Sequence, residues 1–299
     1  MLTAAVDVAV ADRPASPGRL AIFYGVPSLV NGASGDIERA AREFAPYDVV
    51  VFGDGLQDER AVEHQSTAEI IRRLAAVRPD TRVFGYIALG RTRRLSDEAV
   101  ADAIARWDRM GVHGIFLDEA GYDFGVTRSR QNAAIDAAHG AALHVFVNAF
   151  NPDDVLAGGT HLQAGDLFLL ESFTVRKGSV ESTDRWYARA RSAAEHSRRT
   201  GVEVWAVTTP DMQGRFDKPL CTLAWWSTAL WGFRGIGWGE PLYAAPSSVM
   251  PLRECRGDDR VAGGPFASDV SRDGARFRRQ TEAGYLEVDL RRQAGRFVR

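Results

Sequence analysis

The sequence predicts an α/β fold: a (β/α)8, or TIM, barrel with a small C-terminal β extension. Eight short, nearly continuous apolar runs occur between residues 20 and 239, as expected for parallel strands covered on both faces. Longer stretches of helical period separate them, which is typical of crossovers through helices. Eight such units in about 220 residues fit a barrel, which commonly takes about 250.

The elements follow in order along the chain. The expected strands are LAIFYG (20–25), DVVVFG (48–53), RVFGYIAL (82–89), HGIFLDE (113–119), LHVFVNA (143–149), DLFLLES (166–172), VEVWAVTT (202–209) and GIGWG (235–239). Helical periodicity covers 37–44, 67–77, 96–110, 128–140, 183–200 and 220–232. Only the fifth connection, NPDDVLAGG (151–159), is too short for a long helix. Ser96 before Glu98, and ESTD (181–184), supply amino-terminal caps.

A doubly wound parallel sheet is the alternative fold. It would carry a glycine-rich phosphate loop after its first strand, and GVPSLVNG (25–32) lacks the GxGxxG spacing. We therefore expect a barrel over 20–243, preceded by a flexible leader over 1–19. The tail, 244–299, begins with loop-like segments and then alternates over 275–298 as two or three short strands.

Composition argues against several classes of partner and cofactor. The net charge is −2 with acids and bases interspersed, which disfavours nucleic acid and anionic membrane surfaces. No run approaches the length needed to cross a bilayer, and the start resembles no signal peptide, so we expect a cytoplasmic protein. The six histidines are scattered, so neither a metal nor an organic cofactor is expected. Cys221 and Cys255 predict no disulfide framework or zinc site, but one bridge stays open.

The carboxyl ends of barrel strands build the active site of such folds. In this sequence polar and aromatic residues stand at those ends: Tyr24, Asp54, Tyr86, Asp118, Glu119, Asn148, Glu171, Thr208, Thr209, Trp238 and Glu240. The fourth run, GIFLDEAGYDFG (114–125), passes directly from apolar residues into two carboxylates. A carboxylate in that position is aimed into the mouth by a rigid strand.

Asp118 and Glu171 form the candidate catalytic pair. Two carboxylates facing one cavity are the minimal equipment for glycoside hydrolysis, because one protonates the leaving oxygen while the other attacks or activates water. Their mutual repulsion and burial would separate their pKa values. The alternative is that Asp118 caps the next helix or pairs with an arginine such as Arg128.

Aromatic residues at or beyond the strand ends are candidates for a sugar-stacking wall. They are Tyr24, Tyr86, Tyr122, Phe124, Phe150, Phe173 and Trp238. The tryptophans within predicted helices, at 107, 186, 225, 226 and 231, are expected to pack on the barrel. The glycines at 235, 237 and 239 could cradle a phosphate, or they could permit close packing where the barrel closes. Lys177, in a polar loop, is expected to be solvated.

Three motifs carry a resemblance to a known family. The sequence resembles the spherulin-4-like glycoside hydrolases and the related endo-α-1,4-polygalactosaminidases in three segments. These are 83–125, which contains the GY strand and the GIFLDE strand, VFVNAFNPDDVL (145–156) and DLFLLESF (166–173). The resemblance implies a (β/α)8 hydrolase of galactosamine-containing polysaccharides, with Asp118 and Glu171 as the catalytic pair and Glu119 as the motif's second acid. The second strand departs from the family pattern, since it ends in FGDGLQDE where an Asn-Pro-Gly turn is usual.

The leading hypothesis is therefore a glycoside hydrolase acting on an amino-sugar-containing polysaccharide, without metal or cofactor. The expected substrate-binding residues are Glu119, Tyr24, Tyr86, Asn148, Tyr122, Phe173, Trp238 and Asp54. Which carboxylate is the acid, whether the mechanism retains or inverts, and the oligomeric state stay open. The rivals are a non-catalytic carbohydrate-binding barrel and a barrel enzyme of other chemistry that holds a phosphate-bearing substrate near Gly237 and Gly239.

Overall fold

A computed structural model describes residues 16–239, 251–257 and 265–299. Most of the expected leader, the expected boundary at 243/244 and Glu240 lie outside the described residues. The first strand begins at Gly18, inside the range that the sequence predicts as leader.

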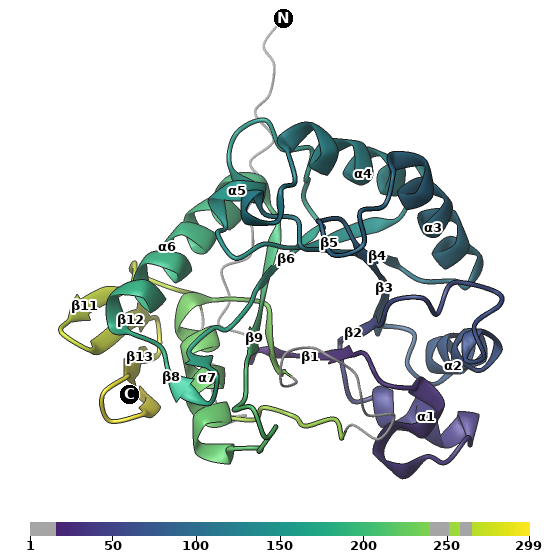
Figure 1. Ribbon diagram of the computed structural model, residues 1–299. Helices are drawn as coiled ribbons and strands as arrows, with labels where there is room; N and C mark the ends of the chain where they lie inside the picture. The colour runs from purple at the N-terminus through teal and green to yellow at the C-terminus, as the bar shows by residue number, and fades with distance from the viewer. Residues whose placement is uncertain (1–15, 240–250, 258–264) are drawn as a thin grey trace, which may run out of the picture.

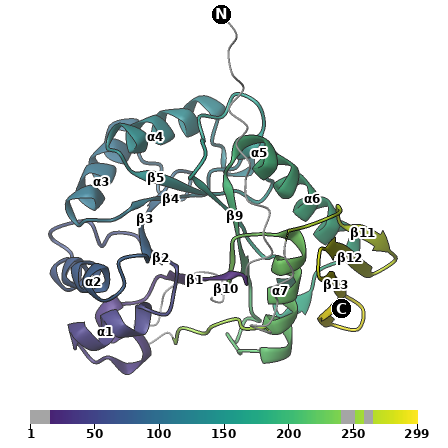
Figure 2. The same ribbon diagram turned by 180° about the vertical axis from the view of Figure 1, so that it is seen from behind.

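The core is a closed barrel of eight parallel strands (Figures 1 and 2). Its strands are β1 (Gly18–Phe23), β2 (Val49–Phe52), β3 (Arg82–Ala88), β4 (Gly114–Asp118), β5 (His144–Asn148), β6 (Leu167–Leu170), β9 (Glu203–Thr208) and β10 (Gly235–Trp238). They pair in chain order, and β10 pairs with β1 to close the ring. All eight overlap the predicted runs, and only β1 extends beyond its run, so the barrel is confirmed.

Helices surround the ring (Figure 1). They are α1 (Ile37–Phe44), α2 (His64–Val77), α3 (Asp97–Arg109), α4 (Arg128–Gly140), α5 (Asp153–Leu156), α6 (Thr183–Thr200) and α7 (Lys218–Trp231), with short 3-10 turns η1 (Pro27–Gly32) and η2 (Tyr122–Phe124). The fifth crossover is the single turn α5, as the sequence predicts. Ser96 caps α3 by accepting from the Ala99 amide at 3.2 Å, whereas α6 begins after Ser182 without a side-chain cap. Among the described residues, no helix is both long and apolar enough to cross a membrane.

Alternate strand residues fill the barrel interior. Phe84, Phe116, Phe146 and Trp205 form one buried cluster there with aliphatic residues of the other strands. The intervening positions face the helices and belong to a second, larger cluster. This two-residue period decides which side chains reach the barrel mouth, because the inward row continues beyond each strand end.

The glycines of β10 are there for packing. A Cβ at Gly235 would lie 2.2 Å from the Trp205 ring, and one at Gly237 would lie 2.6 Å from the Leu20 carbonyl oxygen. Any side chain at either position would therefore push the closing strand away from its neighbours. Of the two interpretations of this cluster, close packing at the barrel's closure is the one supported.

The tail forms a four-stranded antiparallel sheet of β11 (Ser271–Asp273), β12 (Arg276–Thr281), β13 (Gly284–Asp289) and β14 (Ala294–Val298). Its strands outnumber the two or three expected. The sheet packs on α6 and α7, where Phe277 lies 4.6 Å from Trp186 between ring centroids. All five helix tryptophans are buried, but Trp186 and Trp226 also pack against the tail sheet, on Phe277 and Gly295, and not on the barrel alone as expected. Cys221 of α7 and Cys255 form a disulfide, so the bridge that the sequence left open is present.

Candidate active site

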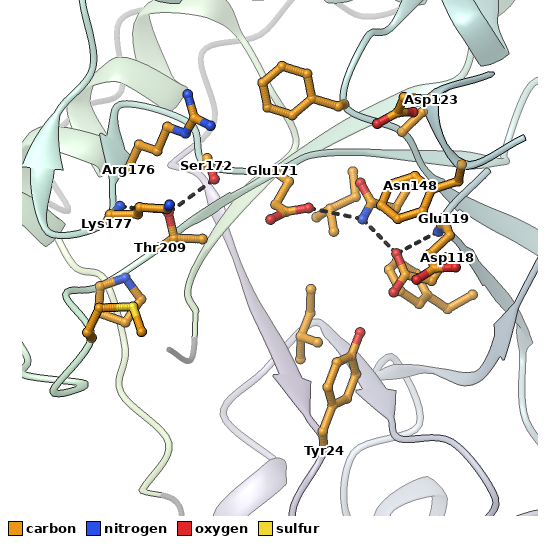
Figure 3. A pocket seen from close by; sticks show the side chains of 18 residues that line it. Tyr24, Asp118, Glu119, Asp123, Asn148, Glu171, Ser172, Arg176, Lys177 and Thr209 are labelled. Atoms are coloured by element: carbon orange, nitrogen blue, oxygen red, sulfur yellow. Dashed lines mark hydrogen bonds between the residues drawn. The ribbon is translucent and has the colours of Figure 1, made fainter. Parts of the chain in front are cut away.

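One cavity of about 380 Å³ opens at the carboxyl ends of the strands (Figure 3). Its polar lining comes from the ends of β4, β5, β6 and β9 and the loops that follow them, and its apolar floor comes from the barrel interior. The lining residues are Ile22, Tyr24, Phe116, Asp118, Glu119, Asp123, Phe124, Asn148, Ala149, Phe150, Leu169, Glu171, Ser172, Arg176, Lys177, Thr209, Pro210 and Met212.

Asn148 links the two predicted catalytic carboxylates. Its side-chain Nδ2 donates to Asp118 Oδ1 at 2.8 Å and to Glu171 Oε2 at 3.3 Å. Both bonds start from the same nitrogen atom, so the two bonded carboxylate oxygens lie at most about 6.1 Å apart. Figure 3 shows the three side chains converging in the cavity from three neighbouring strand ends.

Asp118 has the more strongly hydrogen-bonded carboxylate of the two. Besides the Asn148 bond it accepts from the Glu119 amide at 2.9 Å and from the Tyr86 hydroxyl. Burial raises its pKa, and these three donors oppose that rise by favouring the charged form, although the net effect is still a raised pKa. Burial and the Asp118 charge likewise raise the pKa of Tyr86, so that hydroxyl stays a donor.

Glu171 has a negatively charged neighbour, Asp118, and two positively charged neighbours, Arg189 and Arg176. Burial raises the pKa of its carboxyl group and the charge of Asp118 raises it further, while the Asn148 bond and the guanidinium groups of Arg189 and Arg176 lower it. Arg189 also anchors the strand end, because its Nη2 donates to the Glu171 carbonyl at 2.7 Å. The net effect is a raised pKa, which is the state a proton donor needs at neutral pH.

Glu119 serves the loop as well as the cavity. Its carboxylate accepts from the backbone N–H of Thr92 at 3.1 Å and from the Thr92 hydroxyl. Its backbone adopts a left-handed conformation, with φ of 55°. A Cβ on Gly90 would lie 2.7 Å from Glu119 side-chain atoms, so these two loops pack without a gap. Glu119 thus holds the loop after β3 against the end of β4.

The structure sorts the expected binding residues into two groups. Tyr24, Glu119 and Asn148 line the cavity. Tyr86 lies just outside the lining, where its ring packs edge-on against Tyr24 at 5.2 Å between ring centroids and its hydroxyl bonds Asp118. Phe124 and Phe150, also expected in the wall, line it too. These placements fit the predicted roles, which stay predictions.

Besides Tyr86, four expected binding residues lie outside the cavity lining that the described residues form: Asp54, Tyr122, Phe173 and Trp238. Phe173 is fully buried against Trp186 and Phe233, so it is a core residue and the prediction for it was wrong. The physical reason is a reversal of direction, because Ser172 and Thr174 have φ of 53° and 66° and turn the chain outward after Glu171.

The other three leave the cavity for simpler reasons. Successive side chains of a strand point to opposite faces, and Gly237 occupies the inward position of β10, so Trp238 points outward. Its ring packs on that of Phe216, at 5.2 Å between ring centroids. Asp54 is exposed and forms an ion pair with Arg93. Tyr122 is 51 % exposed on η2, outside the rim. Each was selected by its place in the sequence alone, and none points inward.

Sequence reasoning missed several residues of the wall. Asp123 lines the cavity on the Asp118 side, and Arg176 and Lys177 line it on the other side of Glu171 (Figure 3). Lys177 is exposed, as predicted, but it stands at this mouth. The rarity of lysine could have drawn attention to Lys177, because the chain has only two lysines.

Asp118 does not pair with Arg128, whose guanidinium instead donates to Gln131 and to the Val155 carbonyl at 2.7 and 3.0 Å. Thr127, not Asp118, caps α4. Within 16–239, 251–257 and 265–299, no three histidine, cysteine or acidic side chains are placed to share a metal ion.

No protein-family model matches this chain, and no curated protein matches it. Solved structures with a similar barrel include the 3-dehydroquinate dehydratase of Geobacillus kaustophilus, at 12% identity over 79% of this chain and 86% of that one, with a TM-score of 0.47. Malate synthase of Haloferax volcanii has 15% identity over 75% and 70%, with a TM-score of 0.48. Pyruvate carboxylase of Rhizobium etli has 11% identity over 76% of this chain and 24% of that one, with a TM-score of 0.47. Barrels host many chemistries, so only the site bears on function.

Proposed function

We propose that the protein is a glycoside hydrolase that cleaves an amino-sugar-containing polysaccharide with Asp118 and Glu171. The observation that supports this most strongly is the pair itself, two carboxylates joined through Asn148 inside one cavity at the barrel mouth. A hydrolase of this class needs one protonated and one ionised carboxyl group on opposite sides of the scissile bond.

The two environments support different roles. Asp118 accepts three hydrogen bonds, which favour its anion as nucleophile or as stabiliser of the positive charge that develops on the sugar. Glu171 accepts one from Asn148 and has the Asp118 charge beside it, which favours its acid form. We therefore assign Glu171 as the acid that protonates the leaving oxygen, and as the base that later activates water.

The separation of the pair favours retention of configuration. The bonded oxygens lie at most about 6.1 Å apart, which is below the ~6.5–9.5 Å of inverting enzymes and compatible with the ~5–5.5 Å of retaining ones. At the shorter separation no water fits between the second carboxylate and the sugar, so that carboxylate attacks directly. In this mechanism Asp118 forms the covalent glycosyl bond.

The Asp118 side of the cavity suits an amino sugar. Asp123 is exposed there and Glu119 lies beside it, so both carboxylates can attract the ammonium group of a deacetylated sugar. The ring of Tyr24 and that of Phe124 supply apolar surface for the sugar face. Figure 3 shows Asp118, Glu119 and Asp123 on one side of the cavity.

The test is release of reducing ends from partly deacetylated polygalactosamine and its glucosamine counterpart. Glu171→Gln and Asp118→Asn should each lower the rate by at least about 10²-fold, since each removes the charge or proton that its step requires. Matched controls are Glu195→Gln and Asp102→Asn, exposed helix acids that each pair with an arginine four residues away. They should leave the rate unchanged.

Two outcomes would contradict the proposal. Activity that both site variants retain would mean that the pair has a structural role. Sugar binding without turnover in the wild type, unaffected by Asp118→Asn beyond a few-fold, would favour the non-catalytic binding barrel. The phosphate-binding rival loses its support, because Gly237 is packed against β1 and both carboxylates line the cavity.

A further inference from the structure

A small hairpin forms the wall of the cavity opposite Asp118. It consists of β7 (Val175–Arg176) and β8 (Ser179–Val180), inserted between β6 and α6. The end of β9 holds it firmly, because Gly178 N donates to the Thr209 carbonyl at 3.0 Å and Lys177 N donates to Thr209 Oγ1 at 3.1 Å. The hairpin tip is therefore a fixed part of the mouth.

This wall carries positive charge. The guanidinium groups of Arg176, Arg185 and Arg189 all lie over the ring of Phe150, at 5.5, 4.7 and 4.6 Å from its centroid. Buried Glu181 pairs with two of them, Arg185 at 3.2 Å and Arg189 at 3.5 Å. Arg176 and Lys177, by contrast, form no salt bridge with any residue that the structure describes.

Nearby acids do not neutralise the two remaining cations. Asp211, which packs against Gly178 in the hairpin tip, pairs with Arg215 at 2.6 Å. Glu171 and Glu181 both interact electrostatically with Arg176. Glu171, however, has a raised pKa and the Arg189 guanidinium as a further neighbour, and Glu181 already pairs with two other arginines. Arg176 and Lys177 thus present positive charge to the cavity that they line.

Lys177 is an unusual choice for the turn. Its φ is 50°, in the left-handed region, which residues other than glycine, asparagine and aspartate adopt only with strain. The neighbouring turn position is Gly178, with φ of 74°, which is what turn geometry favours. Asparagine would fit Lys177's backbone better, so the ammonium group is present despite the conformation.

We propose that Arg176 and Lys177 form a subsite for an anionic group, a carboxylate or a sulfate, on a sugar next to the cleaved bond. The proposal rests on the glycosidase function proposed above and narrows its substrate to acidic glycans that contain amino sugars. Arginine forms paired hydrogen bonds to such oxyanions, and lysine adds a point charge. With Asp123 on the opposite side, the cavity would bind an ammonium group at one wall and an anionic group at the other, as a glycan with alternating charges presents them.

The test is calorimetric binding of three tetrasaccharides to the whole protein. The first is N-deacetylated, unsulfated chondroitin, in which glucuronate alternates with galactosamine. The second is the same chain with its carboxylates reduced to alcohols, and the third is its O-sulfated form. We expect at least one anionic form to bind about tenfold or more tighter than the reduced form, with the advantage lost at high salt. A gain for the unsulfated chain identifies a carboxylate site, and a gain for the sulfated chain alone identifies a sulfate site.

The variants are Lys177→Asn and Arg176→Gln, alone and together. The double variant should bind all three tetrasaccharides alike. Matched controls are Lys218→Asn, at the only other lysine, and Arg42→Gln on α1, both exposed, and they should keep the preference. Lys177→Asn should keep or raise the melting temperature, because asparagine tolerates the left-handed backbone, so lost binding cannot be attributed to misfolding.

Equal binding of all three chains by the wild type, no binding of any, or a preference that survives in the double variant would overturn the subsite. Hydrolysis separates this failure from failure of the proposed function. Glu171-dependent cleavage of amino-sugar polymers without a charge preference would leave the hydrolase standing and remove the subsite. Charge-dependent binding without cleavage of any glycan would leave the anion-binding site standing and remove the hydrolase.

Discussion

Asn148 determines how the two carboxylates behave at the scale of single residues. Its side-chain nitrogen bonds both Asp118 and Glu171, and it lowers the pKa of each by stabilising the charged form. Asn148, at the end of β5, therefore links the two acids through hydrogen bonds and offsets part of the repulsion between their charges. The consequence is that the pair titrates as a unit, so a change at Asn148 must move both pKa values.

Asn148→Ala should therefore shift the pH dependence of hydrolysis. Loss of its hydrogen bonds raises both pKa values, so the acid limb of kcat/KM, set by Asp118, and the alkaline limb, set by Glu171, should both move to higher pH. The rate at the optimum should fall by about 10²-fold, as for other lost polar contacts to reacting groups. Asn132→Ala, on α4, is the control. An unchanged profile in Asn148→Ala would show that the amide does not act on the pair.

Glu171→Gln should stabilise the fold while abolishing activity. The pKa of Glu171 is raised in the folded state, so its ionisation costs folding free energy at any pH above the ordinary glutamate value. The variant should melt a few degrees higher than the wild type at pH 7, and the gap should close as the pH falls below about 4, where the wild-type carboxyl is protonated both folded and unfolded. Thermal melts across pH test this without any substrate, and Glu195→Gln should show no gap. A variant that melts lower at pH 7 would contradict it.

At the scale of elements, the sequence predicts strands well and loop directions poorly. Every barrel strand overlaps a predicted run, and all but β1, which begins two residues early, lie within one, because a strand buried on both faces leaves a continuous apolar stretch. The inward parity of Phe116 and Leu169 carries on to Asp118 and Glu171, which is why a rule about strand ends found the pair. It failed where the backbone reverses, as at Ser172, since three-dimensional packing holds that left-handed conformation and residue type does not announce it.

The cavity residues that lie in loops could not be predicted from strand periodicity either, because three-dimensional packing sets the positions of these loops. The hairpin of β7 and β8 is only a few residues long and has no periodicity, so nothing in the pattern placed Arg176 at the mouth. Its position follows from bonds to Thr209, a residue 32 positions further along from Lys177. Contacts between distant loops of this kind have no local signature in the sequence.

Gly85 of β3 tests how tightly an element is fitted to the barrel. A Cβ there would lie 2.1 Å from the ring of Trp107 on α3, whose indole nitrogen donates to the Tyr86 carbonyl at 3.1 Å. Gly85→Ala should therefore destabilise the protein by about 1–3 kcal/mol or more through overpacking. Gly140→Ala, at the end of α4 with open space around it, is the matched control and should be neutral. Equal unfolding midpoints in denaturant for both variants would contradict this packing.

At the scale of the whole molecule, the segment 251–257 connects the last barrel unit to the first. Cys255 bonds Cys221 of α7, the Leu252 amide donates to Asn31 of η1 at 2.8 Å, and Glu254 pairs with Arg19 of β1 at 3.4 Å. The contacts span the place where β10 meets β1 and the ring closes. A disulfide persists in oxidising compartments and is rare in the cytosol, so this bridge argues against the cytoplasmic expectation.

Reduction of the bridge should loosen this closure. Because the two cysteines are 34 residues apart, the loop they close accounts for about 2–4 kcal/mol of stability, and the wild type should lose that amount in dithiothreitol. The Cys221→Ser/Cys255→Ser double variant should have the lower stability from the start and should not respond to the reductant. Trypsin should then cut at Arg253 or Arg256 faster than in the oxidised wild type, because the segment has lost its covalent attachment to α7. A wild type whose unfolding midpoint is the same with and without dithiothreitol, or whose thiols react with iodoacetamide before reduction, would show that the bridge does not hold the barrel closed.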